Sequence, residues 1–332
     1  MTATLEAPVA RRPHEPLRIS PGVALFVIWA GGAAVLALWW KDTTFVIGLD
    51  GWLTNAGRIT GLLAGYLVVV LLALMARVPA LERGVGTDQL ARWHAMAGRY
   101  TVSLVVAHTL LIIWGYAVTA HTNVVHETGG LLTTYPDVLM ATVATGVLVA
   151  VGVASARAAR RRLRYETWHF IHLYTYLAVA LAFSHQFSTG ADFVTNRPAR
   201  LLWAAMYIAV AALLFWFRMV RPVAQGLRHR MRVVEVRRES SDTVSVWLTG
   251  RHLDELGAEP GQFFRWRFLA RGMWWAANPY SLSAPPRPDL LRITVKAAGD
   301  HSRALAAVRP GDRKSTRLNS SHLAVSRMPS SA

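Results

Sequence analysis

The chain of 332 residues is apolar and basic: 53% of its residues are hydrophobic, 17% are charged, and the formal net charge is +17. Ordinary soluble domains carry roughly 25% charged residues, so this composition favours a membrane protein. The chain contains no Cys, which excludes disulfides, Cys-ligated iron–sulfur or zinc sites, thiolate-ligated haem and covalently attached c-type haem.

Six apolar segments are long enough to cross about 30 Å of hydrocarbon, which takes around 20 helical residues. They are residues 22–40, 57–76, 94–118, 138–156, 169–187 and 201–220. The first is too long for the apolar core of a signal peptide, and no small-residue cleavage site follows it. We therefore predict a cytoplasmic N-terminal segment over 1–21 and a six-helix membrane domain over 22–221.

The basic residues predict how this domain is oriented, because cytoplasmic loops of membrane proteins are enriched in Lys and Arg. The N-terminus, the second and fourth loops and the segment after the sixth span carry several arginines each, including Arg11, Arg12, Arg77, Arg83, Arg157, Arg161 and Arg221. The third loop has none. We therefore predict a multi-pass protein of the cell membrane with both termini in the cytoplasm. The basic residues flank apolar segments, so we expect no nucleic acid partner.

Histidines inside two of these segments are the strongest functional signal, because ionisable residues at membrane depth are costly and usually functional. His94 and His108 are 14 residues apart, about 21 Å along a helix and about 40° apart around it. His172 and His185 are 13 residues apart, about 19.5 Å, which matches the first pair in height. Two helices that each present two imidazoles at matched depths predict two haems held by bis-His ligation.

Three points weigh against this interpretation. Thirteen residues of ideal helix place His172 and His185 about 140° apart, so the helix must be distorted or the haems must meet it from different sides. His169 is a rival for the inner ligand, but it lies about 24 Å from His185 along the helix and fits the height less well. A buried histidine can also be an ordinary hydrogen-bonded core residue. We retain His172.

The same two segments resemble a known family. The resemblance is carried by Trp93, His94, Arg99 and His108 in the third segment and by residues 165–172 and His185 in the fifth. These patterns resemble the ferric-reductase-like transmembrane proteins, the superfamily of ferric reductases and NADPH oxidases. The resemblance implies two stacked b-type haems, the cytoplasmic one held by His94 and His172 and the outer one by His108 and His185. Arg58 is a secondary candidate, either for a haem propionate or acceptor or as a side chain that reaches the membrane surface.

After Pro222 the pattern changes to short alternating runs at 232–238, 243–249, 262–269 and 290–295, separated by Gly, Pro and Asp. Period-two runs with turn residues between them predict a small antiparallel β-barrel. We assign it to a cytoplasmic domain over 222–311.

A motif in this domain, residues 278–283, resembles the flavin motif of ferredoxin-reductase-type barrels. The resemblance implies an FAD site built from Asn278, Pro279, Tyr280, Ser281, Lys296, Gly299 and Ser302. Tyr280 would stack on the isoalloxazine and Ser281 would bond near its reactive nitrogen, while Gly299 and the helix opened by Ser302 would approach the pyrophosphate. Residues 260–263 match the strand before that motif. Asn278 departs from the family, which has Arg or His there, and this puts phosphate binding in doubt unless Lys296 or another cation substitutes.

The nicotinamide-binding domain that this family carries is missing from the sequence. Residues 312–322 resemble the translation of a common sequencing adapter, and the patternless tail to 332 fits no element of a barrel. We therefore expect residues 312–332 to be non-native and the natural protein to be longer.

The resemblance implies an oxidoreductase that moves electrons from cytoplasmic NAD(P)H through FAD and two b-type haems to an external acceptor, ferric iron or dioxygen. One alternative is a haem b subunit that receives electrons from a separate reductase or from quinol. Another, from a different class, is a transporter or channel with intramembrane histidines. The sequence does not choose between NADH and NADPH, and it does not indicate an oligomeric state.

Overall fold

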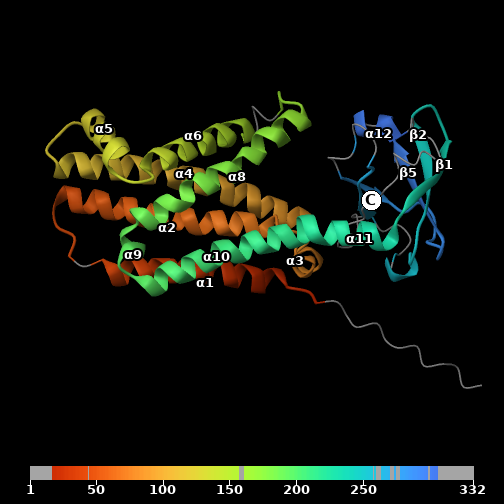
Figure 1. Cartoon of the computed structure of the whole chain (residues 1–332), viewed down its shortest axis with the longest axis horizontal. Coiled ribbons are helices and arrows are strands. Elements are labelled where there is room, and N and C mark those ends of the chain that lie inside the picture. Colours follow the sequence, from red (N-terminus) through yellow and green to blue (C-terminus); the bar gives the residue numbers. More distant parts are fainter. Residues whose placement is uncertain are drawn as a thin grey trace, which may run out of the picture.

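The computed structural model has two parts, a bundle of long helices and a small group of β-strands at one end of it (Figure 1). It describes residues 17–43, 45–156, 161–256, 258, 263–269, 273, 277–297 and 300–305. Gly299, residues 260–262 and the predicted adapter-like tail lie outside the described residues. We call the end of the bundle next to the strands the sheet end, and the opposite end the far end.

Five helices of the described residues are long and apolar enough to cross a membrane. They are α1 (Pro21–Asp42), α2 (Gly48–Leu74), α4 (Thr87–Thr119), α6 (Val138–Ser155) and α10 (Arg197–Phe215) with its continuation to His229. Large apolar side chains cover the outside of the bundle, and on α1 Phe26 and Trp29 are 73% and 75% exposed. Such a surface suits hydrocarbon, where the helices also satisfy their own backbone polar groups.

The fifth predicted segment forms α8 (Tyr165–Ser188), a 24-residue helix that packs along α6 (Figure 1). It is not among the five helices that length and composition mark as spans. Glu166 and the three histidines of α8 explain the difference, because polar side chains lower the hydropathy of a helix that is otherwise long enough. The structure therefore has five clear candidate spans, with α8 beside them, where the sequence predicted six.

Short helices connect the long ones: α3 (Pro79–Gly84) at the sheet end, and α5 (Val124–Thr134) and α9 (Ala191–Val194) at the far end (Figure 1). Asn123 caps α5, because its side-chain oxygen accepts hydrogen bonds from the backbone N–H groups of Val125 and His126 at 3.1 and 2.9 Å. His121 and His126 are exposed.

The last membrane helix does not stop at the predicted domain boundary. After α10 the chain makes a π-helical turn, η1 (Trp216–Val220), and continues as α11 (Arg221–His229). Pro222 does not end the helix, because it occupies the first turn of α11, where its missing N–H breaks no α-helical bond. The end of α11 is fixed to the strand part by Arg228, whose side chain is 2.7 Å from Glu255.

The strands form two small antiparallel sheets. One has the order β1 (Arg232–Arg238), β2 (Thr243–Thr249), β5 (Leu290–Lys296), and the other pairs β3 (Phe263–Trp266) with β4 (Asn278–Ser281). A single bridge, Leu282 to Ile293, connects them. The predicted strand positions are confirmed for β1, β2 and β5, but the prediction of a closed barrel is wrong for the described residues, because the ladders do not continue around a ring.

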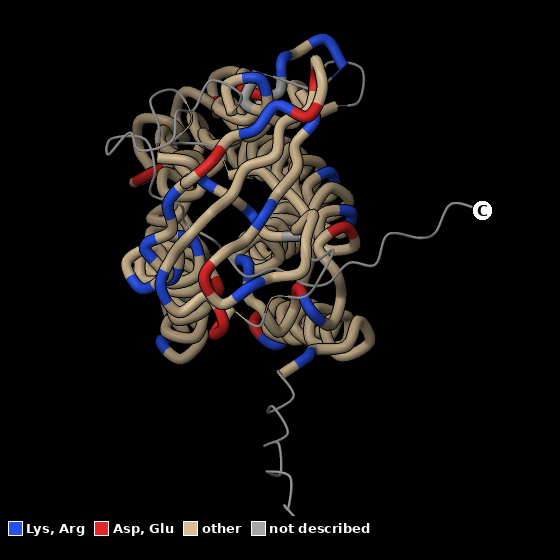
Figure 2. The backbone as a smooth tube through the Cα atoms, turned by 90° about the vertical axis from the view of Figure 1, so that its right-hand side faces the viewer, with Lys and Arg blue, Asp and Glu red and all other residues tan. Residues whose placement is uncertain are grey.

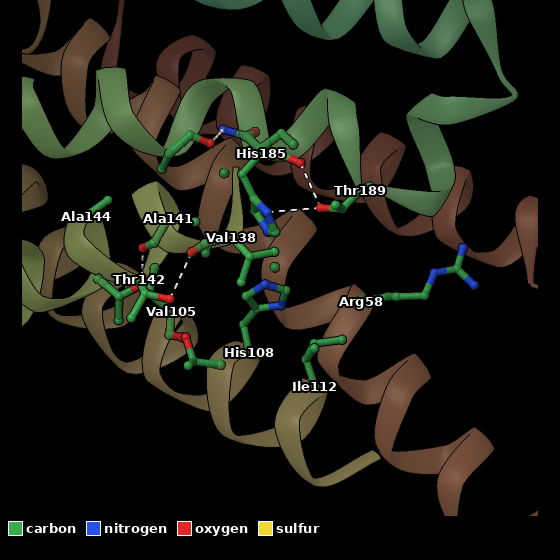
Figure 3. A pocket seen from close by; sticks show the side chains of 18 of the residues that line it. Arg58, Val105, His108, Ile112, Val138, Ala141, Thr142, Ala144, His185 and Thr189 are labelled. Atoms are coloured by element: carbon green, nitrogen blue, oxygen red, sulfur yellow. Dashed lines mark hydrogen bonds between the residues drawn. The ribbon is translucent and has the colours of Figure 1, made fainter. Parts of the chain in front are cut away.

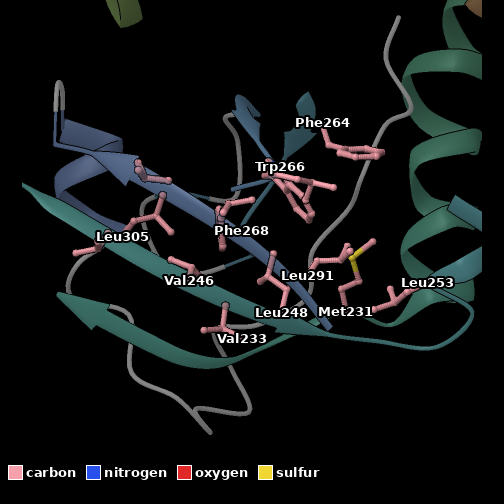
Figure 4. Close-up of a cluster of buried hydrophobic side chains, with 14 of the residues drawn as sticks. Met231, Val233, Val246, Leu248, Leu253, Phe264, Trp266, Phe268, Leu291 and Leu305 are labelled. Atoms are coloured by element: carbon pink, nitrogen blue, oxygen red, sulfur yellow. The ribbon is translucent and has the colours of Figure 1, made fainter. Parts of the chain in front are cut away.

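One hydrophobic core joins the two sheets (Figure 4). Val246 and Leu248 on β2, Trp266 on β3 and Ile293 on β5 are all fully buried. Along β5 the buried residues alternate with half-buried and exposed ones, as side chains on one face of a sheet do. Each is worth about 1.5–3 kcal/mol of burial, so the strand part has a core of its own. Two further elements border it, η2 (Asp254–Leu256) and α12 (Asp300–Leu305).

Candidate functional site

Two pairs of histidine rings face one another between α4 and α8. The ring centres of His94 and His172 are 5.9 Å apart at an interplanar angle of 71°. Those of His108 and His185 are 6.4 Å apart at 62°, and Figure 3 shows these two imidazoles directed toward each other. The structure therefore brings together, in the predicted combinations, the four histidines that the sequence singled out.

These separations fit a metal ion between the rings. Two metal–nitrogen bonds of about 2 Å, with about 1 Å more from each nitrogen to its ring centre, place the ring centres roughly 6 Å apart. No three His, Asp or Glu side chains gather as a metal-ion cluster among the residues that the structure describes. A haem iron needs only two protein ligands, because the porphyrin supplies the other four, and so each pair is sufficient for it.

Backbone carbonyls of α2 orient the two histidines of α4. The Nδ1 of His94 lies 3.2 Å from the carbonyl oxygen of Leu71, and the Nδ1 of His108 lies 2.8 Å from that of Gly57. A carbonyl oxygen only accepts, so in each contact Nδ1 is the protonated nitrogen, and Nε2 is left for a metal. Leu71 and Gly57 are separated by 14 residues, like the two histidines, because α2 and α4 pack side by side along their length.

The two histidines of α8 have different surroundings. The Nδ1 of His185 lies 2.9 Å from the hydroxyl oxygen of Thr189. The ring of His172 stacks on Trp168 at 5.1 Å and 24°, and its Nδ1 is buried without a hydrogen-bond partner among the described residues. His172, which the sequence analysis preferred over His169, is the residue whose ring faces His94.

The 140° between His172 and His185 needs no break in α8, which is helical throughout Tyr165–Ser188. Figure 1 shows that α8 runs obliquely to α4. When two helices cross at an angle, the face of one that meets the other changes along its length. Side chains from different faces of α8 therefore reach α4 at the two levels.

A cavity of about 310 Å³ surrounds the His108–His185 pair, a size within the range of small-molecule and cofactor sites. It is lined by seven helices, with apolar side chains and threonines such as Thr109, Thr142 and Thr145. Figure 3 shows Arg58 at one side of it. A mainly apolar cavity with a few polar groups suits a flat hydrophobic ring system.

Glycines of α2 make room for this pair, and the sequence analysis missed them. A Cβ on Gly61 would lie 2.6 Å from the Nδ1 of His108, closer than any side chain tolerates. Gly57 supplies the carbonyl for the same ring, and Gly65 lies under Trp203. The three glycines are four residues apart, and this spacing of small residues is the signal that could have shown where another helix approaches closely.

Polar side chains of α10 form hydrogen bonds next to the His108–His185 pair. The indole N–H of Trp203 donates to the side-chain oxygen of Gln186 at 2.7 Å, and the hydroxyl of Tyr207 donates to the carbonyl of Gly65 at 3.0 Å. Gln186 follows His185 directly in α8, so these bonds tie α8, α10 and α2 together next to the imidazole. Hydrogen bonds of this kind satisfy polar groups that lipid cannot.

Arg58 forms an ion pair with a carboxylate of the protein. Its guanidinium lies 2.8 Å from the Oδ1 of Asp192 on α9 and 3.1 Å from the side-chain oxygen of Asn55. The side chain of Asp192 is only 4% exposed. Of the two roles considered from the sequence, reaching out to the membrane surface does not occur, because the guanidinium turns inward to the edge of the cavity.

The predicted flavin residues lie at the edges of the two sheets. Tyr280 is half-buried against the core, and its carbonyl oxygen accepts a hydrogen bond from the indole of Trp266 at 3.0 Å. Asn278, Pro279 and Ser281 share strand β4 with it. The ammonium of Lys296 lies 3.4 Å from a carboxylate oxygen of Asp242.

The pyrophosphate segment is described only in part. Helix α12 begins at Asp300, two residues earlier than predicted, so Ser302 lies within its first turn and does not open it. Gly299 lies outside the described residues.

Glu82, on α3 at the sheet end, is a buried carboxyl that the sequence analysis did not consider. It is 7% exposed, and burial raises its pKa to about 7, although Arg221, Arg218 and Arg83 act in the opposite direction. Between pH 4.5 and 7 the folded protein holds a proton that the unfolded chain releases. The free energy of unfolding should therefore fall over this range as the pH rises, by about 3 kcal/mol at 1.36 kcal/mol per pKa unit.

Thermal unfolding in detergent at pH 5 and pH 8 checks this expectation with a Glu82→Gln variant, whose amide resembles the protonated carboxyl. We expect the variant to be more stable than the parent at pH 8 and to lose most of the parent's pH dependence. Glu239→Gln, at an exposed position, is the control and should keep it. An unchanged pH profile in Glu82→Gln would show that another group is responsible.

These features define a multi-pass membrane protein with paired histidines inside its helix bundle. A family model described as ferric reductase like transmembrane component matches residues 60–183, a range that includes His94, His108 and His172 and ends just before His185. The match lies within the membrane part of the chain and agrees with the resemblance seen in the sequence; a similarity to this family suggests a membrane oxidoreductase. A comparison with curated proteins found no match to the chain.

Proposed function

We propose that this protein transfers electrons across the membrane through two b-type haems, one held by His94 and His172 and the other by His108 and His185. The observation that carries the proposal is the pair of facing imidazole pairs, at ring separations of 5.9 and 6.4 Å. The similarity of residues 60–183 to the ferric-reductase-like family supports it. Bound haem supplies single-electron chemistry in a region that isolated charges do not cross cheaply.

The chain's own residues then have defined tasks. The four imidazoles hold two irons at levels about 21 Å apart along α4. The carbonyls of Gly57 and Leu71 keep the Nε2 atoms of the α4 histidines available as ligands. Mainly apolar side chains line the cavity around the His108–His185 pair. No side chain in this arrangement needs to donate or accept a proton during the reaction.

We propose that α8 is the sixth span and that the sheet end lies in the cytoplasm, so that both termini are cytoplasmic and the protein resides in the cell membrane. Figure 2 looks onto the sheet end, where Lys and Arg are more frequent than Asp and Glu. Cationic residues remain on the cytoplasmic side during insertion. In this orientation the His94–His172 pair lies nearer the cytoplasm, and the far end faces the external acceptor, ferric iron or dioxygen.

On the cytoplasmic side we propose an FAD site in the strand part, reduced by NAD(P)H. Tyr280 offers an aromatic face beside the core, and Ser281 follows it on the same strand. Lys296 is a candidate for the cation that Asn278 does not provide, and Ser302 and Gly299 are candidates for the pyrophosphate.

The second candidate is a haem b subunit that receives electrons from a separate reductase or from quinol. The contact between Lys296 and Asp242 favours it, because a cation already beside a carboxylate attracts a phosphate less strongly. With a neutral Asn278 at the motif, FAD binding would then be weak.

The test is the absorption spectrum of the purified chain in detergent, oxidised and reduced with dithionite, with haem quantified as pyridine haemochrome. We expect two low-spin b-type haems per chain. FAD released on denaturation and measured by fluorescence distinguishes the two haem candidates, since only the first predicts one flavin per chain. A folded but colourless protein would exclude both and favour a transporter or channel with intramembrane histidines.

A further inference from the structure

Arg218 is a cation that has no role in the histidine pairs described above. It lies in the π-helical turn η1, where the chain leaves the bundle at the sheet end. π turns inside α-helices are uncommon and occur often at functional sites, because the extra residue redirects the side chains of the turn. The guanidinium is close enough to interact electrostatically with His94 and His169. Its charge therefore acts on the part of the bundle that holds the pair at the sheet end.

A second contact places Arg218 at the level of this pair. One terminal N–H of its guanidinium donates to the hydroxyl oxygen of Tyr176 at 3.0 Å. Tyr176 is four residues after His172 in α8, so the two side chains lie on one face of that helix, one turn apart. The hydroxyl of Tyr176 therefore anchors the guanidinium of Arg218 close to His172.

Among the residues that the structure describes, no carboxylate forms an ion pair with the guanidinium of Arg218. Its Nε is buried without a hydrogen-bond partner among the same residues. The Nε of Arg58 at the far end is also buried without a partner among these residues, but Asp192 pairs with its guanidinium. A buried donor on a charged group is costly unless a partner completes it.

We infer that Arg218 binds a carboxylate of the group held between His94 and His172, namely a propionate of that haem. The inference rests on the proposed function. A guanidinium matches a carboxylate in shape and charge and binds it more firmly than a neutral donor does. Glu82 is the competing carboxyl of the chain itself, since it interacts with Arg218 at longer range.

The experiment is a redox titration of the purified full chain, in which the absorbance of its haems is monitored. A cation beside a haem favours the reduced form, which carries one positive charge less. Arg218→Gln should therefore lower the midpoint potential of one haem and leave the other unchanged. Repeating the substitution in a His108→Ala background, where only the haem near the sheet end remains, identifies the shifted haem.

Three further variants make the result specific. Arg228→Gln removes a cation that lies further along the same helix and is 63% exposed, and it should shift neither haem. Tyr176→Phe should give a smaller shift of the same haem, because the guanidinium loses its anchor but keeps its charge. Arg218→Lys should restore most of the potential.

Defined outcomes overturn the inference. Two haems with parental potentials in Arg218→Gln would show that Arg218 binds no propionate, while the proposed function would stand. No effect of Arg218→Gln in a Glu82→Gln background would assign the shift to Glu82. If Arg218→Gln loses both haems, Tyr176→Phe decides: a shift confined to the haem near the sheet end supports the inference, and parental potentials of both haems contradict it. A parent chain without haem would instead refute the proposed function.

Discussion

Replacing His108 with alanine should reduce the haem content of the purified chain from two to one. The side chain of His108 faces His185 across the cavity with ring centres 6.4 Å apart, and a methyl group offers no ligand in its place. The other pair is on a different level of α4, about 21 Å away along the helix, so its haem should remain. Pyridine haemochrome quantification per mole of protein measures this directly.

The same measurement tests which histidine of α8 is the ligand at the level of His94. His172→Ala should also leave one haem, whereas His169→Ala should leave two, because it is the ring of His172 that faces His94. His126→Ala is the matched control, since His126 is exposed on α5. Two haems in His172→Ala together with one in His169→Ala would reverse the assignment of the ligand. Two haems in His108→Ala would refute the far-end site.

Substituting Gly61 with alanine should disturb the same haem without removing a ligand. The added Cβ would lie 2.6 Å from the Nδ1 of His108, and the ring atoms nearest to it have little freedom, because Nδ1 is also 2.8 Å from the carbonyl of Gly57. Either the imidazole turns away or α2 and α4 separate. Overpacking of this kind costs about 1–3 kcal/mol, and the haem held by His108 and His185 should be lost or become high-spin.

Gly146→Ala is the control for this substitution. Gly146 lies in α6, where a Cβ would meet nothing within 4 Å, and alanine is the better helix former by about 0.5–1 kcal/mol. We therefore expect Gly146→Ala to keep both haems and the parental unfolding temperature or a slightly higher one. A parental spectrum in Gly61→Ala would mean that α2 and α4 are further apart at this level than the structure indicates.

Much of the architecture could be predicted because it depends on local patterns. Long apolar runs gave the positions of the membrane helices, and alternation of apolar and polar residues gave strands β1 and β2 with their observed bounds and β5 to within one residue. The predictions of a sixth span and of a closed barrel were less accurate, because local patterns say little about either. The polar residues of α8 weaken its apolar pattern, and closure of a barrel depends on pairing between distant strands, which no local pattern encodes.

The sequence by itself determined which residues are candidates for iron and at what heights they lie, because the rise of a helix converts spacing into distance. Only the tertiary structure decided how these residues meet. The oblique course of α8 brings His172 and His185 to the same partner helix, the packing of α2 against α4 supplies the carbonyls of Gly57 and Leu71, and the π turn brings Arg218 beside Tyr176. These contacts join segments far apart in the chain, and they exist only once the helices have packed.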